Sequence, residues 1–449
     1  MTASFRDTLD EVVALYHQND RPWIVGFSGG KDSTAVLQLV FQALSELPSA
    51  ERVKPVHVVS NDTLVEIPRV ASMVGDALEK IGDAAKRIGL PIITAQTRPQ
   101  IDDSFFVNLI GRGYPSPTSH FRWCTERMKI GPTTEYIRRV VDQQGEVIIL
   151  LGARKAESAT RAQALANRTI EGSKLKRHST LPRCLVYTPI EDWDTREVWV
   201  YLFQVPSPWG ADNKELFRLY SRADGGECPL VIDSTTPSCG NSRFGCWVCT
   251  VVEHDRAIEG FIESGDESLE PLLTFRNFLK EVRSKRQWRE RVRKNGQVLN
   301  QKGDEVWGPF TLEARKAILR KLLETEEQAG IKLISVDELS LIQKLWRQGD
   351  RSYNGPQADT CFSVSAILRQ VKGEANMTIP SKLSGNGDRE DKLLLEICQK
   401  YGIRADIVER LRAAEEKVSH LQRRDGIFND IEDIFDQALP SSTSRANQD

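Results

Sequence analysis

A six-residue segment with the sequence Ser-Gly-Gly-Lys-Asp-Ser, at positions 28–33, constrains the fold of this chain more than any other feature. It lies between a short apolar segment, Trp23–Phe27, and residues 33–44, whose apolar side chains recur with helical spacing. A glycine-containing turn between a strand and a helix points the N–H groups of the helix start at a bound phosphate. The sequence therefore predicts an α/β sheet whose first turn binds an anion, the alternative being an ordinary turn without a ligand.

Further segments repeat this alternation along the first half of the chain. Strands are predicted at 56–60, 90–95 and 147–151, and helices at 1–20, 67–89 and 195–203. Such an order is typical of a doubly wound, mostly parallel sheet with helices on both faces.

The second half has a different pattern. Helical spacing of apolar residues predicts helices at 256–284, 311–328, 336–348, 389–400 and 404–423, with a hairpin at 297–307. We therefore expect four regions: a nucleotide domain at 1–223, a cysteine-rich segment at 224–255, a mainly helical region at 256–437 and a disordered tail at 438–449.

The composition narrows the classes of function. A formal net charge of −2 argues against coating of nucleic acid by bulk charge, so a contact with DNA or RNA would need a local basic patch. Residues 1–20 lack the features of a secretory signal, and no stretch reaches the roughly 20 apolar residues of a membrane helix. We therefore expect a cytoplasmic protein that does not enter a membrane.

The chemistry of the 28–33 segment suits an anion. Its glycines allow the backbone to approach a ligand closely, and the hydroxyls of Ser28 and Ser33 can donate to phosphate oxygens. Lys31 adds positive charge, and Asp32 can orient the loop or bind Mg²⁺. The spacing G-x-x-x-x-G-K-S/T is absent, so this is not a Walker A loop.

A second candidate anion site follows the strand predicted at 147–151. After Gly152, the chain carries Arg154 and Arg161, whose guanidinium groups can donate in pairs to phosphate or sulfate at the carboxyl edge of the sheet. Solvated surface charges are the alternative for these arginines.

Cys124 lies in the string Phe-Arg-Trp-Cys-Thr-Glu, close to Arg122 and Arg127. Neighbouring positive charges favour the thiolate form, so Cys124 is a candidate for a reactive thiol that carries sulfur. A small buried side chain is the equally weighted alternative.

Four of the eight cysteines fall within one short segment, at Cys228, Cys239, Cys246 and Cys249. In a reducing compartment such crowding favours a metal site over disulfides. The Cys-x-x-Cys pair can place two thiolates on one metal centre, while the preceding loops supply two more. Because most four-cysteine zinc sites have two such pairs, the single pair here favours an iron–sulfur cluster over Zn²⁺.

A basic segment near residue 288 is the candidate for contact with nucleic acid. Arginines and lysines at seven positions between 283 and 294 surround Trp288, with only Glu290 opposing them. Arg286 and Arg289 would bind backbone phosphates, and Trp288 would stack on an unpaired base. A solvated helix face is the alternative.

The string at 28–33 is the signature of the PP-loop ATP pyrophosphatases, and the surrounding chain resembles their branch that includes phosphoadenosine phosphosulfate (PAPS) reductases. That resemblance implies cleavage of ATP to pyrophosphate, with Mg²⁺ and with Lys31 and Asp32 as catalytic residues alongside Cys124. Asp62 stands where this family contacts the nucleoside, a cap at the strand end being its alternative. The implied ATP-binding residues are Ser28, Gly29, Gly30, Lys31, Asp32, Ser33, Asp62, Gly152, Arg154 and Arg161.

Within that branch, the strings around the four cysteines, at 108–115 and at 154–158 are similar to DndC, the sulfurtransferase family of bacterial DNA phosphorothioation. The resemblance covers about residues 20–320. It implies a [4Fe–4S] cluster on Cys228, Cys239, Cys246 and Cys249, and replacement of a non-bridging DNA phosphate oxygen by sulfur. Implied partners are DNA, a cysteine desulfurase as sulfur donor, and other phosphorothioation components of the DndD and DndE type.

Three other functions share parts of this pattern. A sulfonucleotide (PAPS or APS) reductase has the same fold and loop, but uses a cysteine in a C-terminal tail, and residues 438–449 contain none. A tRNA thiolase shares the ATP activation and the cluster. An iron–sulfur DNA-binding subunit with a vestigial loop is the non-enzymatic alternative, against which the intact 28–33 string argues.

Overall fold

The structure of the chain is a computed structural model. It describes residues 3–157, 172–223, 245–293 and 307–350, and single positions at 163, 170, 364, 367–368, 371, 407–408, 411 and 431. The chain divides into two compact units, residues 1–377 and 378–449. In the second unit the described positions are helical. The predicted helices at 389–400 and 404–423, the tail and nearly all of the predicted hairpin at 297–307 lie outside the described residues.

The first unit is built on a six-stranded sheet with the strand order β3-β2-β1-β4-β6-β5. Its strands are β1 (Trp23–Gly26), β2 (Val56–Asn61), β3 (Ile92–Thr97), β4 (Val147–Leu150), β5 (Lys176–Arg177) and β6 (Cys184–Tyr187). All neighbouring pairs are parallel except β5 with β6. The predicted mostly parallel sheet is therefore confirmed.

Two of these strands, β5 and β6, were not predicted from the sequence. Strand β5 consists of two charged residues, so it carries no apolar pattern that could indicate a strand. Its pairing with β6 decides its conformation. Strand β6 has four residues, as β1 and β4 have, and is paired on both sides, so its short apolar segment was a signal that the sequence offered.

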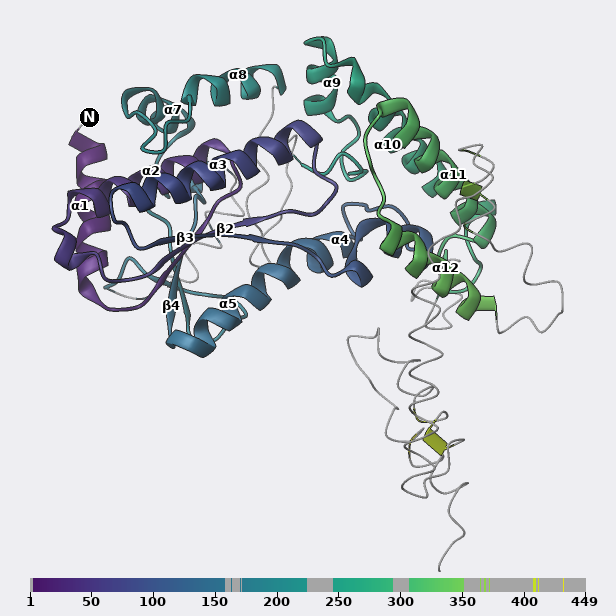
Figure 1. Cartoon of the computed structure of the whole chain (residues 1–449), viewed down its shortest axis with the longest axis horizontal. Helices are drawn as coiled ribbons and strands as arrows, with labels where there is room; N and C mark the ends of the chain where they lie inside the picture. The colour runs from purple at the N-terminus through teal and green to yellow at the C-terminus, as the bar shows by residue number, and fades with distance from the viewer. Residues whose placement is uncertain are drawn as a thin grey trace, which may run out of the picture. The chain divides into compact units, whose positions relative to one another are not determined.

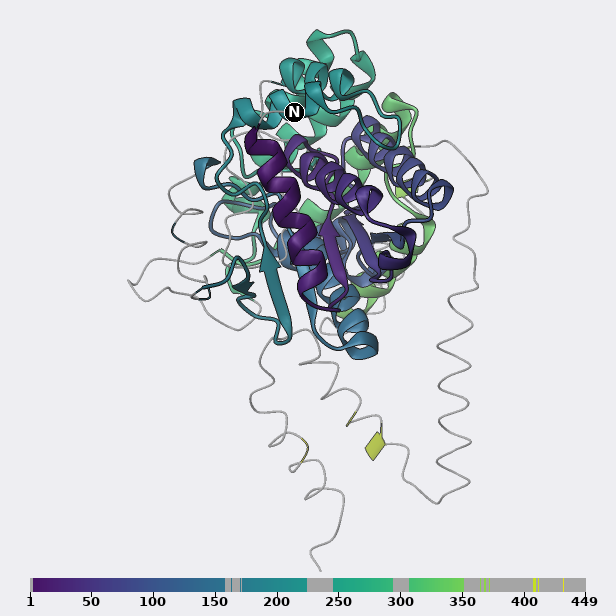
Figure 2. The ribbon, with the colours of Figure 1, turned by 90° about the vertical axis from the view of Figure 1, so that its left-hand side faces the viewer.

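Helices cover both faces of the sheet, as the predicted doubly wound architecture requires. Figure 1 shows α2 (Lys31–Glu46) and α3 (Pro68–Arg87) on one face and α5 (Gly131–Gln144) on the other. The amino-terminal helix α1 (Ala3–Gln18) packs against α2 and lies at the front in Figure 2. Helix α7 (Thr195–Gln204), which also contacts α2, begins with a capping box between Asp194 and Glu197.

The order of the strands fixes where a ligand can bind. The chain runs outward from β1 through β2 to β3, then returns to place β4 on the other side of β1. After β1 the chain continues toward β2, and after β4 it continues toward β6, on the other side of this point. Ligands of doubly wound sheets bind at such a point, outside the carboxyl ends of the strands.

Beyond the sheet, the described chain to residue 350 is mainly helical. Its helices are α8 (Asn213–Ala223), α9 (Arg256–Glu263), α10 (Glu270–Arg283), α11 (Leu312–Ala329) and α12 (Val336–Asp350). The helix predicted at 256–284 is in fact two, because Gly265 between them has a φ of +97°, which a helix cannot continue through. None of the described helices is long and apolar enough to span a bilayer.

The helical region packs on a short π-helical segment, Val107–Gly111, which contacts both α11 and α12. The Trp346 indole donates to the carbonyl of Ile110 at 2.9 Å. A Cβ atom at Gly111 would lie 2.8 Å from the end of the Leu345 side chain, so Gly111 lets α12 lie close without displacing that side chain. The helices therefore form one packed body with the sheet rather than a separate lobe.

The central strands set the stability of this unit. Ile24 of β1 is fully buried, whereas Ile93 of the edge strand β3 is 48% exposed. We expect Ile24→Ala to lower the free energy of unfolding by about 3 kcal/mol, and Ile93→Ala by less than about 1 kcal/mol. Urea denaturation of both variants measures this difference, and equal midpoints would contradict the assigned register of the sheet.

Candidate active site

The 28–33 loop turns sharply between β1 and α2. Gly29 has a φ of +76°, and a side chain there would lie 2.7 Å from Val74 of α3. The hydroxyl of Ser33 donates to the Gly30 carbonyl at 3.0 Å and lies 3.1 Å from the Ser28 hydroxyl. Gly30 caps α2 without a side-chain hydrogen bond. The start of α2 thus offers backbone donors, as the sequence predicts for an anion site.

Asp32 lies in a buried cluster of charges. Its carboxylate accepts from Lys31 Nζ at 2.8 Å and from Arg154 Nε at 2.6 Å. Both side chains of the Asp32–Arg154 pair are almost fully buried, at 2% and 3% exposure. This arrangement favours the first of the two predicted roles of Asp32, which is to orient the loop. It also gives Arg154 a partner within the protein, so binding of an anion by Arg154 stays a prediction.

Gly152 brings the turn after β4 against the 28–33 loop. A Cβ atom at this position would lie within 2.8–2.9 Å of the backbone of Asp32 and Ser33. Only glycine permits so close an approach of two backbones. Gly152 therefore serves the packing of the two turns on each other. Arg161, the remaining predicted ligand of this region, lies outside the described residues.

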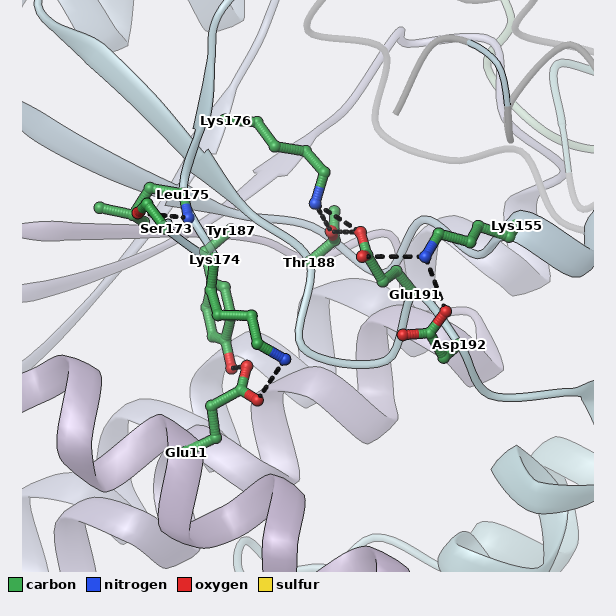
Figure 3. Close-up of polar contacts among 10 residues, drawn as sticks. All are labelled: Glu11, Lys155, Ser173, Lys174, Leu175, Lys176, Tyr187, Thr188, Glu191 and Asp192. Carbon is green, nitrogen blue, oxygen red and sulfur yellow. Dashed lines mark hydrogen bonds and ion pairs between the residues drawn. The ribbon is translucent and has the colours of Figure 1, made fainter. Parts of the chain in front are cut away.

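A polar network fixes the chain next to Arg154. Figure 3 shows the Glu191 carboxylate between Lys155 and Lys176, with the Thr188 hydroxyl donating to it at 2.7 Å. Burial raises the pKa of Glu191, but the hydrogen bonds from Lys176 and Thr188 outweigh it and hold the pKa below its usual value. The segment around Glu191 thus anchors the turn that carries Arg154.

Asp62 follows β2 and has local partners. Its carboxylate accepts from the backbone N–H of Leu64 at 2.9 Å and from Arg98 Nε at 3.0 Å. These bonds stabilise the turn in which Leu64 adopts a φ of +65°. They match the strand-end cap that was one of two roles considered for Asp62, and the contact with a nucleoside stays a prediction.

The Cys-x-x-Cys pair lies against this same turn. Cys246 Sγ is 3.3 Å from the hydroxyl of Thr63, and Cys246 forms a backbone bridge with Glu66. The N–H of Trp247 donates to Val65, and the N–H of Cys249 donates to Cys246, which closes the turn between the two thiols. Strand β2 is the parallel neighbour of β1. The turn that the Cys-x-x-Cys pair contacts and the 28–33 loop therefore follow the carboxyl ends of adjacent strands.

A third thiol, Cys124, lies in a single helical turn, Trp123–Thr125, and Cys249 contributes to its pKa. Burial contributes most to the pKa of Cys124, and the neighbouring Cys249 raises it further, to about 12. Burial likewise raises the pKa of Cys246 well above its usual value, although Lys129 opposes the rise in both.

Arg127 forms an ion pair with Asp103 and lies over the ring of Tyr114. Lys129 favours the thiolate of Cys124 but does not offset the cost of burying a charge there. A thiolate stabilised by Arg122 and Arg127 stays a prediction, as does the alternative of a small buried side chain.

The described residues contain part of the predicted metal site. Cys246 and Cys249 lie within the described residues, whereas Cys228 and Cys239 lie outside them. Within the described ranges, no three His, Cys, Asp or Glu residues are grouped closely enough to hold a metal ion. Cys246, Cys249 and the nearby Cys124 nevertheless present soft sulfur donors, which suit iron–sulfur clusters and zinc alike.

Arg276 anchors the chain that follows the thiols. This arginine is 1% exposed and donates to the carbonyls of Cys249 at 3.0 Å and Glu253 at 2.9 Å, and also to that of Val252. A buried guanidinium satisfied by carbonyls is a strong local constraint. The helix α10, which carries Arg276, thereby positions the Cys-x-x-Cys turn, a role that the sequence did not indicate.

The basic segment around Trp288 is not a helix face. It begins where α10 ends, as a short 3₁₀ turn, Arg286–Trp288. Arg289 donates to the Gly308 carbonyl at 2.7 Å, and the guanidinium groups of Arg286 and Arg289 both lie over the ring of Trp307. Burial and nearby arginines lower the pKa of Arg289 to about 10. These contacts hold two chain segments together, and binding of DNA phosphates by Arg286 and Arg289 stays a prediction.

The chain belongs to the phosphoadenosine phosphosulfate reductase domain family, whose family model matches residues 22–252. The matched segment contains the 28–33 loop, Cys124 and all four cysteines of the predicted cluster. The mostly parallel sheet and the family match agree on the predicted fold.

Two curated relatives come from Methanocaldococcus jannaschii. The uncharacterized protein MJ0066 is 25% identical over 248 residues, which are 55% of this chain and 40% of that protein. The uncharacterized protein MJ0973 is 24% identical over 177 residues, 39% of this chain and 34% of that protein. The similarity thus spans less than half the length of these relatives.

Two solved structures are also similar. The PAPS reductase from Candida auris, in a phosphate complex, is 16% identical with a TM-score of 0.30, and the match covers 48% of this chain and 84% of that one. The U34-tRNA thiolase NcsA from Methanococcus maripaludis, with its [4Fe-4S] cluster, is 12% identical with a TM-score of 0.28, covering 62% and 80%. Scores this low support no conclusion about function.

The close approach at Gly152 leads to a direct test. We expect Gly152→Ala to lower the free energy of unfolding by about 1–3 kcal/mol, because the added methyl group overlaps backbone that cannot yield freely. Gly75→Ala in α3 is the matched control, since a side chain there meets nothing within 4 Å. Alanine at 75 should be neutral or stabilise by roughly 0.5–1 kcal/mol, as helix propensity predicts. Urea midpoints that rank the two variants the other way would contradict the packing of the two turns.

The anchor at Arg276 leads to a second test. Arg276→Leu leaves three carbonyls without their donor, and we expect a loss of about 3 kcal/mol in the free energy of unfolding. The exposed Arg138→Leu on α5 is the control and should change it by less than about 0.5 kcal/mol. Alkylation of Cys246 and Cys249, followed by peptide mass spectrometry, should be faster in Arg276→Leu alone. Unchanged alkylation rates would show that Arg276 does not hold the turn.

Proposed function

We propose that this chain is an ATP-dependent sulfurtransferase of DNA phosphorothioation. The observation that carries the proposal is the shared location of its two predicted reactive parts. The 28–33 loop follows β1, the Cys246 thiol lies against the turn after β2, and these strands are parallel neighbours. A nucleotide and a sulfur-bearing group would therefore meet at one edge of the sheet. Membership in a family named for a sulfonucleotide reductase supports the same kind of chemistry.

The proposed reaction has two steps. A non-bridging oxygen of a DNA phosphate attacks the α-phosphorus of ATP, and pyrophosphate leaves with the electrons of the broken P–O bond. The terminal sulfur of a persulfide, which originates in a cysteine desulfurase, then attacks the DNA phosphorus, and AMP leaves with the former DNA oxygen. To complete this second step, a second thiol cleaves the S–S bond, which leaves the sulfur on phosphorus and a disulfide that an external dithiol reductant reopens. The first step is necessary because an unactivated phosphodiester oxygen is a very poor leaving group.

The residues of the loop would bind the nucleotide. The backbone donors at the start of α2 and the charge of Lys31 would neutralise the β- and γ-phosphates, and Mg²⁺ would supply further positive charge there. Asp32 and Arg154, which are buried and paired, would hold the loop in one conformation, so that little reorganisation accompanies the reaction. Gly152 keeps the turn after β4 in contact with the loop.

The thiols would hold the cluster. Cys246 and Cys249, together with Cys228 and Cys239, are the proposed ligands of a [4Fe–4S] centre, which thiolate donors suit. Cys124 lies near Cys249 and would remain available to carry or orient sulfur. DNA, the desulfurase and the DndD- and DndE-type components are proposed partners, with Arg286, Trp288 and Arg289 as the proposed contact with DNA.

Mass spectrometry of host DNA tests the proposal. We expect phosphorothioate dinucleotides in cells that carry the wild-type gene and none in cells with Cys249→Ala. Cys184→Ala is the matched control, because Cys184 is a buried free thiol in β6, within the core of the sheet. Labelled sulfur in tRNA, or reduction of PAPS or APS by the purified protein, with no phosphorothioate in DNA, would replace this function by a tRNA thiolase or a sulfonucleotide reductase.

A further inference from the structure

The hydroxyl of Tyr220 lies against the start of α2. It accepts a hydrogen bond from the backbone N–H of Lys31 at 3.2 Å, and the Lys31 Nζ atom lies 5.2 Å from the centre of the Tyr220 ring. Tyr220 is buried and comes from α8, far along the chain from the 28–33 loop. The contact therefore places a phenolic oxygen on a backbone N–H at the start of a helix, and such N–H groups are the donors that bind phosphate.

The backbone N–H of Lys31 has room for one acceptor. Lys31 is the first residue of α2, and the cap residue Gly30 contributes no side chain to its N–H groups. A phosphate oxygen that binds at the helix start would take the place that the Tyr220 oxygen occupies. The side chain of Lys31 is itself buried, so a ligand cannot reach this point while the surrounding side chains stay as they are.

We propose that Tyr220 occupies the phosphate position of the loop, and that nucleotide binding displaces its hydroxyl from Lys31 and shifts α8. The proposal rests on the proposed binding of ATP by this loop. Tyr220 is on this view a positioning residue, whose hydroxyl competes with the ligand instead of contributing to its affinity.

Neighbouring aromatic rings explain why the displacement extends to the helix. Trp199 of α7 lies edge-on to the Tyr220 ring at 5.3 Å, and it also contacts Phe217 of α8 at 5.0 Å. Phe203 stacks on Trp199 and contacts Phe217. A ring enclosed on this side cannot leave by rotation alone without disturbing Trp199. The indole of Trp199 therefore reports on the position of Tyr220.

Titration calorimetry with inorganic pyrophosphate and with ATP tests the competition. Tyr220→Phe keeps the ring and removes the hydroxyl, so it should bind pyrophosphate about fivefold more tightly than the wild type, the value of one hydrogen bond that no longer has to be broken. The control is Tyr201→Phe, which removes another buried hydroxyl from a ring that packs against Phe5 and Trp193, and which should leave the affinity unchanged. Unchanged or weaker binding by Tyr220→Phe would overturn the proposal.

Tryptophan fluorescence tests the shift of α8. Pyrophosphate should change the emission of the wild-type protein, and this change should be lost in Trp199→Phe. An emission that does not respond, in a protein that calorimetry shows to bind, would overturn the proposed movement. If neither pyrophosphate nor ATP binds to the wild type or to Tyr220→Phe, the nucleotide function itself fails, whereas wild-type binding with an unaltered Tyr220→Phe affinity refutes the role of Tyr220 alone.

Discussion

The buried ion pair between Asp32 and Arg154 is the interaction on which the arrangement of the site depends. It joins the turn after β1 to the turn after β4, the two strands between which the sheet reverses its order. Without Asp32, both Lys31 and Arg154 would be buried without the carboxylate that they share, and such a loss costs several kcal/mol. The contact of Gly152 with the backbone of Asp32 adds a steric reason for the same geometry. Together these contacts fix the point of the sheet at which doubly wound folds bind their ligands.

A second constraint comes from the helical region. Arg276 of α10 binds the carbonyls that follow the Cys-x-x-Cys pair, while Cys246 itself lies against Thr63 after β2. The thiols are therefore held between the sheet and the helices and depend on both. This explains why the helical region packs so closely on the sheet, with Gly111 allowing α12 to approach. The helices support the site as well as enlarging the fold.

The sequence predicted the elements of the fold that depend on a local pattern of residues. It did not predict the features that depend on partners far along the chain. The strand–loop–helix order around residues 28–33 is written in consecutive residues, so the sheet, its helices and the position of the loop were predictable. Strand β5 was not, because its two charged residues carry no apolar pattern and pairing with β6 decides its conformation. The side chains of Arg154 and Arg289 illustrate the same limit. Each carries a charge that the sequence assigns to an external anion, yet in the fold one binds Asp32 and the other binds a carbonyl and lies over Trp307. Tyr220 and Arg276 gave no signal, since their partners lie far along the chain.

The thiols show what burial demands of any sulfur chemistry at this edge. Burial raises the pKa of Cys124 to about 12 and that of Cys246 well above its usual value, and Lys129 offsets only part of that cost. Near neutral pH both side chains are therefore thiols in the protein alone, and a thiol is a weak nucleophile and a weak metal ligand. Positive charge in addition to Lys129 is needed to stabilise a thiolate in this environment, and a coordinated metal supplies it most directly, because it deprotonates a bound thiol outright. The burial that makes these cysteines poor free nucleophiles is thus compatible with ligation, which is the role that their sulfur donors suit.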